Sequence, residues 1–328
     1  MKISVIVPVF NGENTIASNI AAIKKQKQVP GDLEIIVVDD GSKDSTPAIL
    51  KSIDEITVVT QTNKGPAAAR NAGARRASGE IIVFTDADTI PHADWLNELT
   101  EPFNDPLIKA CAGTYTIANS ESMLAEIVQK EIELRHRNYG NFIKFAGTYN
   151  LAMRKQLFDK IGGFNETFTQ ASGEDNDLCY RILREGCEIK YVNSAKVAHH
   201  HPEKLLRYLK EQYRHGYWRA WLYRQFPERI SGDSYTSFKD GAEVILSLVS
   251  MLAVFSGKRG IHRFMACLSS LALLLMGLWQ MHYARRISEN FFKSLFAALV
   301  FTLRAVARTC GLIHGIILHR PRASGEKK

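Results

Sequence analysis

Short apolar runs alternate with longer amphipathic segments along the first 90 residues, and this alternation constrains the fold more than any other feature of the chain. The apolar runs typical of buried strands lie at 3–9, 33–38, 56–60 and 81–84. Helical patterns separate them at about 14–28, 45–53 and 66–78. Strands and helices that alternate at this spacing predict βαβ units, and therefore an α/β fold with a mixed, mostly parallel sheet flanked by helices.

The middle of the chain is less regular but continues the same pattern. Its predicted elements are strands at 107–117, 147–153 and 188–192, and helices at 121–137, after Gly173 and from Pro202 to about Gln225. No GxGxxG sequence follows the first strand, where VPVFNGE stands instead. This absence argues against a dinucleotide-dependent oxidoreductase, although such an enzyme would share the parallel sheet.

Polar clusters follow three of the predicted strands. They are Asn11–Glu13, Asp39–Ser42 and Asp86–Asp88. Ligands of open α/β sheets bind at the carboxyl ends of the strands, so the functional site is expected at this edge.

Asp86 and Asp88 are separated by one residue directly after a strand, which directs both carboxylates to the same side. Two hard oxygen donors suit Mg²⁺ or Mn²⁺, and such an ion can hold a diphosphate. Taken alone, this pattern is also common in ordinary polar turns. Asp39-Asp40-Gly41 is ambiguous for the same reason, because Asp-Gly is a frequent turn sequence.

The positive charge of the chain is concentrated at one end. The net charge is +8, and residues from Ala242 onward hold 12 Lys and Arg against 3 Asp and Glu. The first 241 residues are therefore close to neutral, which argues against nucleic acid as a partner. Because the basic excess lies among long apolar runs, it favours membrane lipids as the partner.

Residues 264–284 contain no charged side chain and would span about 31 Å as a helix, enough to cross a bilayer core. The apolar run 244–257 is short for a span and suits a re-entrant or interfacial segment. Whether the chain forms a hairpin or lies wholly in the interface is left open by the charge distribution. We expect a catalytic domain over 1–230 and a membrane-associated helical region over 231–328.

A second apolar helix is predicted over 291–318. Lys293, Arg304 and Arg308 would share one of its faces, as in an amphipathic helix that lies in the membrane interface. The alternative is a buried core helix with a solvated cationic face.

Seven motifs occur in order and together resemble those of the family 2 glycosyltransferases, a large inverting family of the GT-A fold. The resemblance covers residues 1–225. The motifs are VIVPVFN at 5–11, VDDGS at 38–42, NKGPAAARNAG at 63–73, TDAD at 85–88, GGF at 162–164, GEDND at 173–177 and VAH at 197–199.

The resemblance implies a nucleotide-sugar donor, most often linked to UDP, and assigns its binding residues. The nucleoside would lie in a cradle formed by the residues that follow the first two strands, namely Pro8, Phe10, Asn11, Glu13 and either Asp39 or Asp40. Lys64, Gly65 and Arg70 match the segment that borders the donor, where their charges could neutralise the diphosphate. A structural ion pair is the alternative role for Arg70.

The resemblance also assigns the metal ligands and the base. Asp88 would chiefly bind a divalent cation, Mg²⁺ or Mn²⁺, with Asp86 on the ribose side or on a bound water. His199 stands where some members supply a further ligand, although the three consecutive histidines leave the choice open. Asp175, with Glu174 beside it, would be the general base that deprotonates the acceptor hydroxyl. In isolation these two carboxylates would simply favour a helix N-terminus.

One departure from the family concerns polymer synthesis. Processive members have Gln-x-x-Arg-Trp after the ED pair, whereas this chain has QYRHGYW at 212–218. We therefore expect transfer of a single sugar to a glycan or lipid-linked acceptor, with the catalytic domain on the cytoplasmic side of a membrane.

The alternative from another class is a catalytically silent GT-A domain that serves as a binding or scaffold module. If the anchor is C-terminal, removing residues after about 235 should release the chain to the soluble fraction.

Overall fold

The computed structural model describes residues 1–233, 236, 238–251 and 259–318, and of residues 259–262 it describes the backbone alone. The chain divides into two compact units. We call them the sheet unit, residues 1–120 and 138–201, and the helical unit, residues 121–137 and 202–328. These units describe packing; the functional division at residue 230 stays a prediction.

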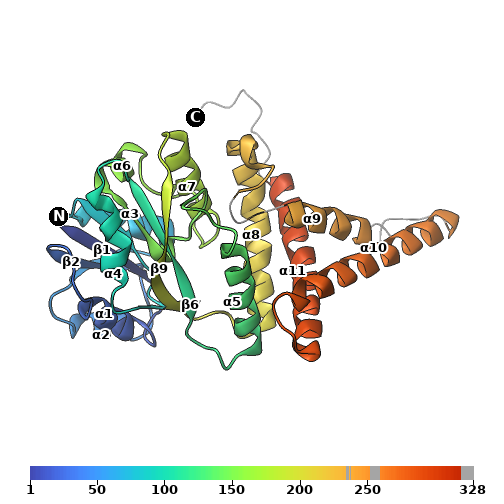
Figure 1. Cartoon of the computed structure of the whole chain (residues 1–328), viewed down its shortest axis with the longest axis horizontal. Coiled ribbons are helices and arrows are strands. Elements are labelled where there is room, and N and C mark those ends of the chain that lie inside the picture. Colours follow the sequence, from blue (N-terminus) through green and yellow to red (C-terminus); the bar gives the residue numbers. More distant parts are fainter. Residues whose placement is uncertain (234–235, 237, 252–258, 319–328) are drawn as a thin grey trace. The chain divides into compact units, whose positions relative to one another are not determined.

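The strands of the sheet unit form one mixed sheet (Figure 1). Its strands are β1 (Ile3–Val9), β2 (Leu33–Asp39), β3 (Thr57–Thr60), β4 (Ile81–Phe84), β5 (Thr89–Pro91), β6 (Ala110–Ile117), β7 (Phe142–Ile143), β8 (Leu151–Arg154) and β9 (Ile189–His199). Their order is β3-β2-β1-β4-β8-β6-β9-β5, with β7 beside β9. The first four are parallel, β8 runs antiparallel to both neighbours, and β6 and β9 are parallel. The predicted mixed, mostly parallel sheet is confirmed.

Helices cover both faces of this sheet, because each face is lined by Val, Ile, Leu and Phe side chains that must leave water. One core includes Ala-rich α3 (Pro66–Arg76), α6 (Lys155–Lys160) and α7 (Glu174–Arg184). The opposite core includes α1 (Ile16–Lys24), α2 (Thr46–Lys51) and α4 (Trp95–Thr100). Short 3-10 helices occur at η1 (Glu101–Asn104) and η2 (Thr148–Asn150).

The predicted strand at 147–153 is wrong in its first half. Residues 148–150 form η2, and only Leu151–Arg154 pair as β8. Asn150 is buried, and its side chain accepts from Trp95 Nε1 and donates to two backbone carbonyls. Side-chain hydrogen bonding of this kind competes with the strand ladder, which explains the turn.

A bulge in the β6–β9 pair determines where β9 ends. The register shifts between Ala112 and Thr114, and Asn150 donates to the carbonyls of Thr114 on β6 and Ala195 on β9, which lie at that irregularity. After the bulge, β9 runs on to His199, whose register partner on β5 is Thr89. The predicted strand 188–192 is therefore too short, and β5 was not predicted.

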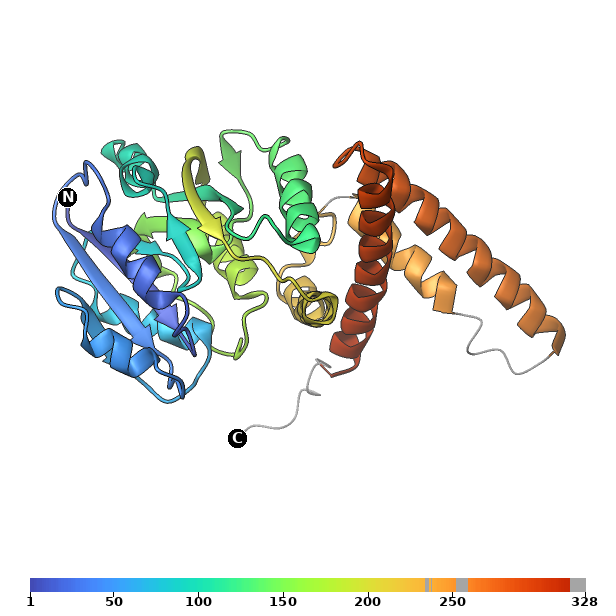
Figure 2. The ribbon, with the colours of Figure 1, turned by 90° about the horizontal axis from the view of Figure 1, so that it is seen from below.

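The helical unit contains α5 (Met123–His136), α8 (Leu205–Gln225), η3 (Pro227–Arg229), α9 (Phe238–Met251), α10 (Arg259–Arg285) and α11 (Phe291–Leu318). Both ribbon views show α8 beside α11, and Figure 2 shows α9 and α10 lying next to each other. Residues 263–285 and α11 are long and apolar enough to cross a membrane by length and composition. Residues 252–257 of the expected run 244–257 lie outside the described residues.

Glycines let α8 and α11 approach closely. A Cβ at Gly216 would lie 2.0 Å from the backbone oxygen of Arg308, and one at Gly311 would lie 2.0 Å from that of Tyr213. Gly315 meets the carbonyl of Tyr217 in the same way. Side chains at these positions would push the two helices apart, so α11 is a packed partner of α8 along its length.

The cations of α11 contact other side chains of the helical unit. Lys293 pairs with Glu126 at 2.7 Å, Arg304 pairs with buried Glu131, and Arg308 Nε donates to Gln212 at 2.8 Å. The expected cationic face is thus not free for lipid headgroups. The helix predicted over 291–318 is present, and the pairing of its cations within the helical unit is a feature that the sequence pattern of one helix does not reveal.

Candidate active site

The loops after β1 and β2 bind each other at the carboxyl edge of the sheet. Asn11 Oδ1 accepts from the Lys43 backbone at 2.8 Å, and Glu13 Oε2 accepts from the Ser45 backbone at 2.9 Å. Asn11 adopts φ +52°, a left-handed conformation that Asn tolerates better than most residues. Asn11 and Glu13 therefore shape the cradle through contacts with protein backbone.

The adjacent carboxylates Asp39 and Asp40 have different environments. Asp40 is buried and accepts hydrogen bonds from the Lys64 backbone, the Gly65 backbone and the Gln61 side chain at 2.7–2.9 Å. Asp39 accepts from the Ser42 backbone at 2.9 Å through one oxygen. Asp39 is as buried as Asp40, so the two differ in hydrogen bonding and not in exposure. Asp40 holds the NKG loop with both oxygens, whereas Asp39 keeps one oxygen available for a ligand.

Replacing Asp40 with Ala is expected to lower the free energy of unfolding by about 3 kcal/mol, because buried backbone donors would lose their acceptor. Urea denaturation measures this change. Asp39→Ala is the matched control and should destabilise the protein less. An equal loss of stability in both variants would contradict the distinction between the two carboxylates.

Other predicted cradle residues differ in exposure. Phe10 is 48% exposed at the mouth of the loop, and Lys64 is also exposed, whereas Pro8 is a half-buried residue of β1. Gly65 adopts φ +91°, and a Cβ there would lie 2.4 Å from the backbone oxygen of Thr169. Only glycine fits this close approach, which lets the NKG loop reach Asp40.

Arg70 joins two of the predicted motifs. Its guanidinium contacts Asp86 Oδ1 at 2.7 Å and Glu174 Oε1 at 3.2 Å, and its side chain is only 4% exposed. Burial alone would lower its pKa, but Asp86, Asp175 and Glu174 together hold the pKa of Arg70 above its usual range. The contacts support the structural role considered for Arg70 and bring the DxD and ED motifs to one place.

The turn that presents Asp86 is closed by hydrogen bonds to its backbone carbonyl. Thr89 Oγ1 donates to Asp86 O at 2.8 Å, and Asn19 Nδ2 donates to the same atom at 3.1 Å. Asn19 is a buried residue of α1, so this helix holds the backbone of the Asp86 turn in place. These contacts position both Asp86 and Asp88.

Asp88 and His199 face each other across the β5–β9 pair. His199 Nε2 lies 4.0 Å from Asp88 Oδ1, both side chains are partly exposed, and the imidazole stacks on Tyr115 with ring centroids 5.5 Å apart. Burial raises the pKa of Asp88, an effect that His199 opposes. Within the described ranges no group of three or more His, Cys, Asp or Glu converges as a ready-made metal site. Asp88 and His199 offer one oxygen and one nitrogen donor, which are ligand types that Mn²⁺ accepts.

Glu174 and Asp175 begin α7 but are not equivalent. Glu174 is buried and accepts from the Ser172 backbone at 2.8 Å in addition to its contact with Arg70. Asp175 is partly accessible, and its Oδ1 accepts from the Thr148 hydroxyl at 2.7 Å. Glu174 is thus engaged by protein on both oxygens, while Asp175 is the more available of the two.

Both carboxyls have perturbed acidities. Burial raises the pKa of Glu174, and the neighbouring charge of Asp175 raises it further. Burial also raises the pKa of Asp175, while Arg70 and the Thr148 hydrogen bond oppose the increase. A carboxylate with an elevated pKa is a stronger base than an exposed one, which suits proton abstraction near neutral pH.

Replacing Thr148 with Val is expected to lower kcat about tenfold and to move the acidic limb of the pH–rate profile up by about one unit. The reason is that the charged form of Asp175 loses a hydrogen bond. Thr148→Ser keeps the hydroxyl and should retain the normal profile. A Val variant with reduced kcat but an unchanged acidic limb would assign Thr148 a packing role only.

Sequence reasoning missed Thr148, Asn19 and Asn150, because single polar residues carry no motif signal.

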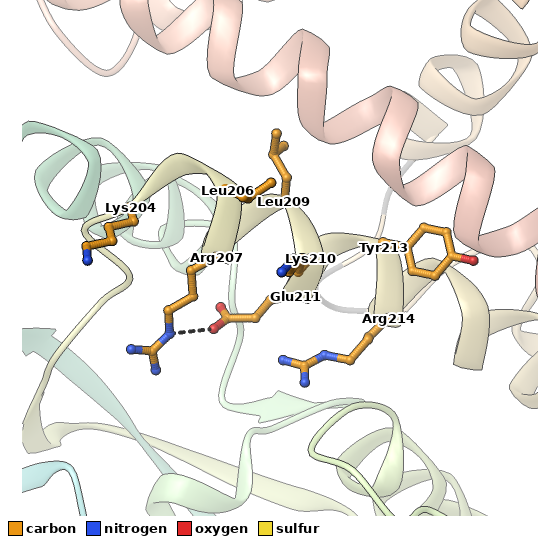
Figure 3. A pocket seen from close by; sticks show the side chains of 8 residues that line it. All are labelled: Lys204, Leu206, Arg207, Leu209, Lys210, Glu211, Tyr213 and Arg214. Carbon is orange, nitrogen blue, oxygen red and sulfur yellow. Dashed lines mark hydrogen bonds and ion pairs between the residues drawn. The ribbon is translucent and has the colours of Figure 1, made fainter.

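A separate hollow of about 950 Å³ lies on α8 and is lined by Lys204, Leu206, Arg207, Leu209, Lys210, Glu211, Tyr213 and Arg214 (Figure 3). Arg207 pairs with Glu211 at 3.3 Å, and the remaining basic side chains give the hollow a positive charge.

A mixed sheet with an acidic turn after its fourth parallel strand is typical of α/β proteins of the GT-A fold. Residues 4–162 match the family described as glycosyl transferase family 2, and residues 131–204 match the N-terminal domain of galactosyltransferase. Residues 4–162 thus form a family 2 glycosyltransferase domain, and the protein is a sugar-transferring enzyme.

Known proteins resemble this chain over most of its length. It is 27% identical to the pre-mycofactocin glycosyltransferase of Mycobacterium tuberculosis, over 96% of this chain and 71% of that protein. Identity to the chondroitin synthase of Escherichia coli is 27%, over 61% of this chain and 35% of that protein. The mannosyltransferase PcManGT of Pyrobaculum calidifontis, solved with GDP-Man and Mn²⁺, has the same fold at a TM-score of 0.56 and 18% identity, covering 93% of this chain and 86% of that one.

Proposed function

We propose that the protein is an inverting glycosyltransferase that transfers one sugar from a nucleoside-diphosphate sugar, UDP-linked, to an acceptor hydroxyl by metal-assisted single displacement. The convergence of the DxD and ED carboxylates on Arg70 carries this proposal. Through Arg70, the proposed donor-binding residue Asp86 and the ED pair that contains the proposed base lie in one cluster of the sheet unit.

The nucleoside would lie against Phe10, with Asp39 as its carboxylate contact. The exposed ring offers a stacking surface, and a carboxylate accepts hydrogen bonds from a base or ribose. Exposed Lys64 is positioned at the loop that Asp40 holds and would face the diphosphate. Pro8, Asn11, Glu13 and Gly65 maintain the shape of this cradle.

Asp88 and His199 would hold the divalent cation, Mg²⁺ or Mn²⁺. When bound, the ion would offset the negative charge that develops on the departing diphosphate. Asp86 is oriented by Arg70 and would face the ribose or a bound water. Mn²⁺ in the PcManGT complex agrees with such a site.

Asp175 would remove the proton from the attacking hydroxyl, with Thr148 fixing its orientation. Attack occurs opposite the leaving diphosphate, so the anomeric configuration inverts without a covalent intermediate. Glu174 would keep Arg70 in place. The alternative of a catalytically silent scaffold is disfavoured because all four carboxylates of the DxD and ED motifs are present, and Asp86 and Glu174 both contact Arg70.

The acceptor would be a glycan or a lipid-linked precursor at a membrane, with the catalytic domain in the cytoplasm. The basic hollow on α8 supports this choice, because Lys204, Lys210 and Arg214 suit an acceptor that bears phosphate. The QYRHGYW stretch supports single-sugar transfer, because it departs from the Gln-x-x-Arg-Trp sequence of processive members. Its residues Gln212 and Gly216 pack against α11.

Thermal stabilisation and donor hydrolysis test this function. Purified protein is screened with UDP-, GDP- and dTDP-sugars in the presence of Mn²⁺, Mg²⁺ or a chelator. We expect stabilisation by a UDP-sugar that requires the metal and is lost in Asp88→Ala. Metal-independent binding, or no binding of any nucleotide sugar, would contradict the proposal.

A further inference from the structure

The paired helices α9 and α10 have their polarity reversed relative to a helix of a water-soluble protein. The buried stripe of α10 includes Ser269 and Gln280, together with Ala272 and Met276. Its exposed face carries large apolar side chains. They include Phe264, Leu271, Leu274, Leu275, Leu278 and Trp279. In water, a helix places such side chains inside and its polar ones outside.

The polar groups between the two helices bond to each other. Gln280 Nε2 donates to Glu243 Oε1 at 2.7 Å, and Ser269 Oγ donates to the Val249 carbonyl at 3.2 Å. Glu243 also pairs with Lys239. In hydrocarbon, polar groups have no water to bind and must find partners within the protein, which is the arrangement seen here.

The length and flanks of the exposed face indicate lipid and not a second protein as its occupant. Exposed Arg263 and Arg285 stand 22 residues apart on α10, about 33 Å along a helix, close to the thickness of a bilayer core. Their charges complement anionic headgroups. Trp279 lies near one end of the run, where aromatic residues of membrane proteins meet the interface.

The second long apolar helix differs. In the most apolar part of α11, 44% of residues are buried, against 22% in α10. Its glycines contact α8, and its cations pair with α5 and α8 side chains. It therefore serves as a core helix of the helical unit.

We propose that α9 and α10 insert their exposed apolar faces into the hydrocarbon layer of a bilayer, while α11 stays outside it as the core helix of the helical unit. This inference rests on the proposed membrane localisation and names the element responsible for it. It does not depend on the sugar-transfer chemistry.

Vesicle flotation of the full chain tests the proposal, with phosphatidylcholine vesicles that contain or lack phosphatidylglycerol. Leu274→Glu/Leu278→Glu, two residues each 59% exposed, should reduce binding at least tenfold. The matched control is Leu295→Glu/Leu299→Glu, with the same spacing on α11, which should bind as the unmodified chain does. Binding should persist at high salt, because burial of apolar surface is not screened as charge pairing is.

A second measurement reports insertion directly. Vesicles with brominated acyl chains should quench Trp279 fluorescence, and Trp279→Phe should remove most of that quenching. Nucleotide binding without vesicles should be unchanged in every variant, so a failure of donor binding would count against the proposed function alone. The insertion proposal is overturned by equal loss of binding in both double variants, by binding abolished by salt, or by a lipid-free oligomer that Leu274→Glu/Leu278→Glu dissociates and that does not bind vesicles.

Discussion

Replacing Asp175 with Asn is expected to reduce kcat by about 10²–10⁴-fold, the range associated with loss of a general base. The amide preserves the shape of the side chain and its contact with the Thr148 hydroxyl, so donor affinity should remain nearly normal. Steady-state transfer kinetics and nucleotide titration separate the two effects.

Asp177→Asn is the control for this change. Asp177 belongs to the same first turn of α7 and pairs with Arg181, away from the Arg70 cluster. It should therefore keep near-normal turnover. Near-normal turnover in Asp175→Asn would refute the base assignment.

In the unmodified enzyme, the elevated pKa of Asp175 places the acidic limb of the pH–rate profile above about 3.9, the ordinary value for Asp, and activity falls as pH drops through it.

Replacing Arg70 with Met is expected to lower the free energy of unfolding by about 3–5 kcal/mol and to abolish transfer. The substitution leaves Asp86, Glu174 and Asp175 close together without their shared cation, and an uncompensated buried charge is costly. Urea denaturation and donor titration measure the two losses.

The stability deficit of Arg70→Met should depend on pH. Without Arg70, the folded-state pKa values of Glu174 and Asp175 rise further above their unfolded values. Protonation at low pH then relieves the repulsion, so the deficit should be smaller at pH 5 than at pH 8. Arg70→Lys keeps the charge but cannot reach two carboxylates as a planar fork does, and should be intermediate. A fully stable Met variant that loses only donor affinity would instead assign Arg70 to the diphosphate.

The sheet unit was largely predictable because its signals are local. Apolar runs ending in Asp39 or before Asp86 mark strands and their carboxyl edge, and the structure has the corresponding strands at Ile3–Val9, Leu33–Asp39 and Ile81–Phe84. The βαβ alternation then restricts the topology to few arrangements. The fold class follows from these patterns, and the family follows from the resemblance of the seven ordered motifs.

Features fixed by contacts between distant residues were not predictable. His199 lies opposite Asp88 because β9 continues past a bulge and pairs with β5, and Thr148 meets Asp175 across 27 residues of sequence. The different roles of Asp39 and Asp40 depend on which of them faces the NKG loop. The pairing of Arg304 with Glu131 likewise spans 173 residues, so α11 seemed amphipathic when considered by itself.

The close packing of α11 on α8 determines how a detergent-free form of the enzyme can be engineered. Truncation after residue 235 would remove α11 together with α10 and uncover the surface of α8 around Gly216, so loss of solubility in that fragment would not report on anchoring. A short linker that replaces only α9 and α10 would retain the α8–α11 pair. The proposed membrane-inserting segment, α9 and α10, thus lies between α8 and α11 in the sequence, two helices that pack against each other within the helical unit.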